Sequence, residues 1–89
     1  MKIWKYEIPR LESFVIDMPE DSRILDIQVQ EHSTPCMWVL INEYSPFKER
    51  KFQLVGTGIP FDTKNLEYVG TWQEQTYVKY VWHLFQVIE

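Results

Sequence analysis

The sequence has few of the features that would cross-link the chain by disulfides, direct it to secretion or anchor it in a membrane. Its 89 residues include one cysteine, Cys36, and 3 glycines, and its longest uninterrupted apolar stretch is residues 36–41. A lone cysteine cannot form an intrachain disulfide, and no cationic segment followed by an apolar run resembles a secretory signal. The stretch is also far shorter than the roughly 20 residues of a membrane helix. We therefore expect a reducing, cytoplasmic location.

Positive charge is scarce as well. The chain has 9 Lys and Arg against 13 Asp and Glu, which gives a formal net charge of -4. Long-range electrostatics would repel duplex nucleic acid or an anionic membrane. A small anion is still permitted, because a few backbone N–H groups and one arginine can hold a phosphate against an unfavourable net charge.

Helical periodicity is missing throughout, whereas period-two alternation recurs. This pattern predicts an all-β fold with little or no helix, a small antiparallel sandwich or partly open barrel formed by one domain over residues 1–89. We expect strands within residues 2–8, 14–18, 23–30, 36–41, 50–56, 66–72 and 76–88. The aromatic fraction of 16% supplies the mass of a small core, because each buried ring removes roughly 150 to 250 Å² from water.

Individual strands carry more specific expectations. Leu25, Ile27 and Val29 alternate with polar residues and should share one buried face. Residues 36–41 are apolar on both faces, as in a central strand covered on both sides. Residues 43–50 have the composition of a charged connection, and Val78 and Tyr80 should share one face of the last strand with Trp82 and Leu84.

So many strands in a short chain leave sheet edges, which proteins manage by closure, by charge or by pairing with another copy. Together with the surplus of aromatic residues, this favours a homo-oligomer, a dimer or tetramer. A monomer with a closed barrel is the alternative.

The segment Leu54–Asp62, LVGTGIPFD, raises the question of a phosphate cradle. It is not a P-loop, because Pro60 and Phe61 follow where a lysine and a helix would be required. Two glycines still permit positive φ values, from which N–H groups can converge on an anion, and Thr57 adds a hydroxyl. The simpler interpretation makes Gly58 part of a turn, and a second Gly-Thr pair at residues 70–71 marks either a bend or a close approach.

Catalytic chemistry finds no support in the residue pattern. His83 has no cysteine or second histidine at metal-ligand spacing, since His32 lies in an expected turn, and no serine occupies a nucleophile elbow. The carboxylates are scattered. We therefore predict a protein that is not an enzyme and uses no metal or cofactor. His83 is either a hydrogen-bonded core histidine or a group that donates to phosphate or stacks under a base.

Six segments carry a resemblance that runs almost end to end: WKYEIPR, IDMPEDSRILDIQVQ, PCMWVLI, LVGTGIP, LEYVGT and VWHLF. In these segments the chain resembles a family of small phage-encoded proteins of uncharacterised-domain type, and it looks like the anti-CBASS sponges. The resemblance implies an oligomer, in the cytoplasm of the infected bacterial host, that sequesters cyclic dinucleotide immune signals such as cyclic GMP-AMP without cleaving them. Ile59 departs from the family pattern, in which a histidine is common, and this puts an imidazole contact from that loop in doubt.

A site for such a ligand needs stacking surfaces, base-edge hydrogen bonds and a small anion cradle. We expect Tyr6, Trp38, Trp72 and Trp82 to stack, although Trp38 has a core role as its alternative. Thr57 and Gly58 would approach phosphate with Arg50 or His83, and Gln28 and Thr71 would contact base edges. The alternative function is an inhibitor that binds a host bacterial protein.

Overall fold

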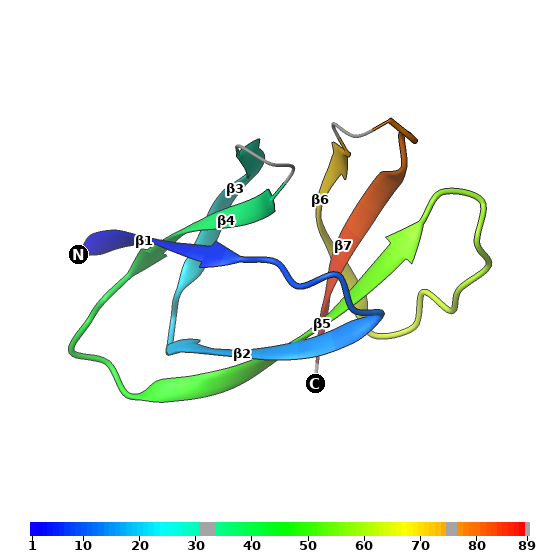
Figure 1. The fold of residues 1–89 in the computed structure, drawn as a ribbon. Helices are drawn as coiled ribbons and strands as arrows, with labels where there is room; N and C mark the ends of the chain where they lie inside the picture. The colour runs from blue at the N-terminus through cyan, green and yellow to red at the C-terminus, as the bar shows by residue number, and fades with distance from the viewer. Residues whose placement is uncertain (31–33, 75–76, 89) are drawn as a thin grey trace.

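The computed structural model describes residues 1–30, 34–74 and 77–88. Its seven strands (Figure 1) are β1 (Lys2–Glu7), β2 (Ser13–Pro19), β3 (Arg23–Gln30), β4 (Thr34–Ile41), β5 (Phe47–Gly56), β6 (Leu66–Gln73) and β7 (Val81–Val87). The described residues form no helix, and hence none that could span a membrane. The all-β prediction is confirmed.

The strands form two antiparallel sheets that do not close into a barrel. Sheet A has the order β1-β4-β3, and sheet B has the order β2-β5-β7-β6. The arrangement fits a small β-sandwich, one of the two architectures expected. The apolar strand β4 is the centre of sheet A, as its composition predicts, and the longest strand, β5, crosses much of the molecule (Figure 1).

The core lies between the inner faces of the two sheets. Sheet A contributes alternate residues of β4, and sheet B contributes side chains from all four of its strands. The buried cluster consists of Ile8, Phe14, Met18, Met37, Val39, Ile41, Phe52, Leu54, Trp72 and Leu84. The rings of Phe14 and Phe52 stack with centroids 5.4 Å apart. Alternation therefore places the large side chains inward in both sheets.

A β-bulge changes the inward face of β3. The register against β4 shifts between Ile24 and Asp26, so Leu25 is the extra residue and is 46% exposed. Ile24 takes its place beside Ile27 against the core. The expectation that Leu25 shares the buried face of Ile27 and Val29 is wrong, because a bulge inverts the alternation on one side of itself.

Two strand boundaries also differ from expectation. Strand β5 begins at Phe47, so the charged residues 47–50 belong to a strand and the connection is shorter than predicted. Strand β7 begins at Val81, and Val78 and Tyr80 before it are exposed. The expected first residue of this strand, Thr76, and His32 lie outside the described residues. The charged residues of β5 do not prevent its pairing with β2, because their side chains extend to solvent.

The two sheets approach each other where β6 meets β3. A second bulge in β6, between Tyr68 and Gly70, accompanies this approach. A Cβ atom added to Gly70 would lie 2.8 Å from Cδ1 of Ile27. The glycine therefore serves both alternatives considered from the sequence, a bend in the strand and a close approach of another segment.

Candidate ligand-binding face

Four side chains on the outer face of sheet B form a continuous row of hydrogen bonds, which we call the His83 row. Nε2 of His83 lies 2.7 Å from the hydroxyl of Thr57, and Nδ1 lies 2.9 Å from the hydroxyl of Thr71. The phenol oxygen of Tyr68 lies 2.6 Å from the same Thr71 hydroxyl. Thr71 is paired with His83 across β6 and β7, which brings their side chains together.

The carbonyl of Val81, at the end of the row, determines which group donates in the hydrogen bond between Thr57 and His83. The Thr57 hydroxyl donates to the carbonyl oxygen of Val81 at 3.2 Å, so its oxygen accepts from Nε2–H of His83. In the Nε2–H tautomer of the ring, Nδ1 then accepts from Thr71, and Thr71 accepts from Tyr68. In that arrangement every hydroxyl donates once along the path. The row thus orients its hydroxyl groups in advance of any ligand.

Aromatic rings lie beside the row. Phe85 follows His83 by two residues on β7 and so points to the same face, roughly 7 Å further along the strand. Its ring centroid lies 5.7 Å from that of Tyr68 and 5.2 Å from that of Phe61. Tyr68 is 58% exposed, and Phe61 is also exposed. A ligand of nucleotide size can therefore contact rings and hydroxyls together.

The Gly-Thr-Gly segment is a turn. The amide of Ile59 donates to the carbonyl of Gly56 at 3.2 Å, and Gly58 has a φ of 87°, which suits the third position of a type II turn. The amide of Thr57 donates to Val81 O. Two of the amides that a cradle would use are thus engaged within the fold, and the hydroxyl of Thr57 is the group that faces outward.

An apolar groove adjoins this turn. It has a volume of about 350 Å³ and lies between residues 10–12 and the segment from Gly56 to Phe61, with Trp82 in its wall. Phe61 belongs both to this groove and to the ring cluster beside the His83 row. The exposed turn, the groove and the row form one continuous candidate face.

Trp72 and Trp82 are engaged within the fold, one by packing in the core and the other by a hydrogen bond. Trp72 is 7% exposed within the core, and Trp82 donates its Nε1–H to Glu74 at 2.8 Å. Glu74 is 4% exposed and also pairs with Arg10. The buried carboxylate is neutralised by Arg10 and joins the β1–β2 connection to β6 and β7. Trp82 contributes to the candidate face as part of the groove wall.

Three other predicted site residues lie on sheet A, away from the His83 row. Tyr6 is on the inner face with the core, and burial raises the pKa of its hydroxyl. Trp38 and Gln28 are on the outer face, where the Gln28 amide donates to Asp26 at 3.3 Å. Sheet A therefore contributes none of the groups in the row.

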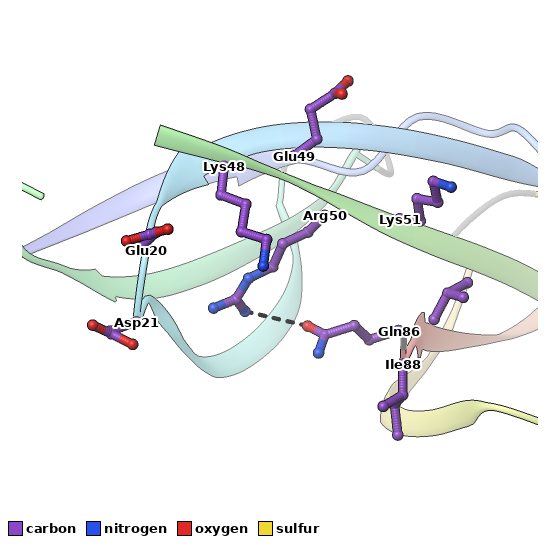
Figure 2. Close-up of a pocket in the computed structure, with 9 residues that line it drawn as sticks. Glu20, Asp21, Lys48, Glu49, Arg50, Lys51, Gln86 and Ile88 are labelled. Atoms are coloured by element: carbon purple, nitrogen blue, oxygen red, sulfur yellow. Dashed lines mark hydrogen bonds between the residues drawn. The ribbon is translucent and has the colours of Figure 1, made fainter. Parts of the chain in front are cut away.

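Arg50 also lies apart, on the inward side of β5. Its guanidinium donates to the side-chain oxygen of Gln86 at 3.2 Å (Figure 2). It also donates to the carbonyl of Ser22 at 2.5 Å. It lines two clefts of about 490 and 440 Å³, the second of which Arg23 also lines. Both arginines thus line clefts, and the hydrogen bonds of the Thr57 hydroxyl go to Val81 and His83 instead.

Of the ten predicted site residues, the structure brings Thr57, Thr71 and His83 together, with Gly58 in the adjacent turn. Sequence reasoning missed Tyr68, Phe61 and Phe85. Alternation along residues 81–87 places Phe85 on the face of His83 and was the available signal. The link from Tyr68 to Thr71 depends on the bulge at residues 68–70, which spacing alone does not reveal.

Within the described residues, no three His, Cys, Asp or Glu side chains gather closely enough to hold a metal ion. The chain matches no curated protein and no solved structure. A family pattern, described as a domain of unknown function, matches residues 1–89. The chain therefore belongs to the DUF7352 family.

Proposed function

We propose that this protein is a binding protein for a small nucleotide of the cyclic dinucleotide class, which it holds at the His83 row without cleaving it. The supporting observation is the juxtaposition of a preoriented hydroxyl–imidazole row with the rings of Tyr68, Phe85 and Phe61. Cyclic dinucleotides carry two flat bases, two phosphates and ribose hydroxyls, and so need both kinds of surface.

The energetics are compatible with tight binding. Stacking of a base on an aromatic ring contributes about 1 to 3 kcal/mol, and a nanomolar dissociation constant corresponds to about 12 kcal/mol. Rings and hydrogen bonds of one face reach this value only if their groups are held in place before binding. The hydrogen bonds of the His83 row provide such order.

The row also supports a role in binding rather than catalysis. Both ring nitrogens of His83 are hydrogen-bonded to threonine hydroxyls, which hold the imidazole in one orientation for contact with a ligand. Its orienting partners are neutral hydroxyls rather than a carboxylate. The groups suit a receptor that recognises its ligand and leaves it intact.

In the biological setting that the resemblance implies, the protein is a phage anti-defence protein. It evades CBASS by sequestering cyclic dinucleotide signals in the cytoplasm of the infected bacterium. We include a homo-oligomer in this proposal, because a second copy over the outer face of sheet B would enclose a ligand that one open sheet face contacts on one side only. This contact is separate from the one that the outer face of sheet A offers to a second copy.

Isothermal titration calorimetry with a panel of cyclic dinucleotides tests the proposal. We expect at least one member to bind and to be recovered intact afterwards. Thr71→Val removes the hydroxyl that links Tyr68 to His83 and should weaken binding by about tenfold, the loss of about one hydrogen bond. Thr63→Val is the matched control, because Thr63 is exposed in the loop before β6.

Three results would count against the proposal: no heat of binding with any member at high micromolar concentration, cleavage of the ligand, or equal losses in the two threonine variants. Mass spectrometry of any small molecule released from the purified protein by heating supplies an independent measurement. A defined complex with a host protein, in the absence of nucleotide binding, would support the inhibitor alternative instead.

A further inference from the structure

A second polar feature lies away from the His83 row, in the cleft of about 490 Å³ beside the end of β7. Lys48 and Arg50 are two residues apart on β5 and therefore point to the same side of the strand. They lie opposite Met18 and Ile16 on β2, which places them on the inward side of sheet B. Both line the cleft.

Arg50 is held in position by neutral acceptors. Ser22 O and Gln86 Oε1 accept one hydrogen bond each from its terminal nitrogens, and a guanidinium has five N–H donors. Gln86 accepts through its oxygen, so its amide N–H groups are left to face the cleft that it lines. The half-buried guanidinium is thus fixed in place with donors to spare.

The two cations are not neutralised by carboxylates within the described part of the chain. Neither Lys48 nor Arg50 forms an ion pair there. Three carboxylates, those of Glu20, Asp21 and Glu49, also line the cleft. Figure 2 shows the carboxylate of Asp21 directed away from the guanidinium, and Glu49 extending from the other side of β5. A half-buried positive charge without a counter-ion favours an anion from solution.

From these contacts we infer that Lys48, Arg50 and Gln86 form a binding site for a phosphate-type oxyanion, distinct from the proposed cyclic dinucleotide face. The planar fork of Arg50 suits two oxygens of one phosphate, and Lys48 adds a point charge. The cleft exceeds the size of a phosphate ion, and Val87 and Ile88 form an apolar part of its wall. The site therefore accepts a phosphate monoester, whose organic part contacts that wall.

NMR titration with inorganic phosphate, adenosine monophosphate and adenosine tests this site. We expect saturable shifts of the Gln86 side-chain amide and of the Ile88 backbone amide with the first two probes and none with adenosine. Tighter binding of the monophosphate would identify an ester as the preferred source, and equal binding would identify the free ion. Both outcomes support the site.

The variant Lys48→Gln removes an exposed cation and should weaken phosphate binding by about tenfold, as expected for a charge-assisted hydrogen bond. Lys5→Gln, on sheet A, gives the same change in net charge and should have little effect. Arg50→Lys keeps the charge but loses the fork, and should weaken binding while the fold persists. Thr71→Val should leave phosphate binding unchanged, which separates this site from the His83 row.

Shifts that do not saturate would overturn the inference. So would equal losses in the Lys48 and Lys5 variants, or shifts of the same residues by adenosine and by its monophosphate. Failure of every cyclic dinucleotide to bind would leave the phosphate site standing, because no group is shared between the two sites.

Discussion

Tyr6 shows how far the role of one residue depends on where the fold places it. Its hydroxyl oxygen is buried and has no hydrogen-bond partner among the described residues. A buried polar atom without a partner costs about 1 to 3 kcal/mol, because it loses its water and gains nothing in return. The ring contributes to the core, but its hydroxyl opposes folding.

Tyr6→Phe should therefore raise the free energy of unfolding by about 1 kcal/mol. Urea denaturation followed by tryptophan fluorescence measures the change. Tyr77→Phe is the control, because Tyr77 is exposed and should tolerate loss of its hydroxyl without effect. A loss of stability in Tyr6→Phe would show that the hydroxyl has a partner after all.

Cys36 gives a prediction that depends on pH. Its thiol is 1% exposed, and burial raises its pKa, with the negative charge of Glu7 acting in the same direction and the positive charge of Lys5 against it. The folded state therefore prefers the neutral thiol. Its contribution to stability is complete below the pKa of the unfolded thiol and is lost as the pH rises from that value through the folded pKa.

We expect the free energy of unfolding to decline less at alkaline pH in Cys36→Ser than in the parent protein. Denaturation curves at neutral and alkaline pH measure the difference. In the parent, Ellman's reagent should react slowly with the native thiol and rapidly in denaturant. Equal rates in the two conditions would contradict burial of the thiol.

At the scale of the elements, the contact between β3 and β6 rests on the missing side chain of Gly70. Gly70→Ala would place a methyl group 2.8 Å from Cδ1 of Ile27, so the side chain of Ile27 must move. Overpacking of this kind typically costs about 1 to 3 kcal/mol. Since Cδ1 is the end of a flexible side chain, we expect a value in the lower part of that range.

A double-mutant cycle tests the origin of this cost. Ile27→Val removes Cδ1, so Gly70→Ala should cost less in that background than in the parent. Gly56→Ala is the control, because its nearest side-chain atom, Trp82 Cζ3, lies 3.4 Å away. Additive effects of Gly70→Ala and Ile27→Val would show that the strand tolerates the methyl group by another route.

At the scale of the whole molecule, the outer face of sheet A favours contact with a second copy. Trp38 lies at its centre, in register with Lys5 of β1 on one side and Asp26 of β3 on the other. Ile3 on the same face is 60% exposed. A two-fold axis parallel to β4 would place Lys5 against the partner's Asp26 twice, around the two tryptophans.

We therefore expect Lys5→Glu and Asp26→Lys each to shift the protein towards monomer. The double variant, which restores opposite charges across the axis, should recover the dimer. Light scattering after size exclusion measures the molar mass. A parent protein that is monomeric at high concentration, or single variants that dimerise like the parent, would exclude this interface.

The sequence predicted most of the fold because alternation reports burial directly wherever a strand is regular. It failed for Leu25 because a bulge shifts the pattern without a residue that signals it. It predicted three members of the His83 row by residue type, but it could not pair them or add Tyr68. Those contacts depend on the register between β6 and β7 and on the offset at residues 68–70.

The pairing order of the strands has a consequence for how the chain folds. Strand β1 pairs with β4, and β2 pairs with β5. The first two strands are therefore synthesised well before the strands with which they pair. During synthesis, only the β3–β4 hairpin is a local structure until residue 56 has emerged. Distant pairings slow folding, typically to milliseconds or seconds, since the intervening chain must be ordered before any contact compensates. Ribosome-bound fragments that lack β5 should consequently remain sensitive to protease within β2, whose partner strand is missing.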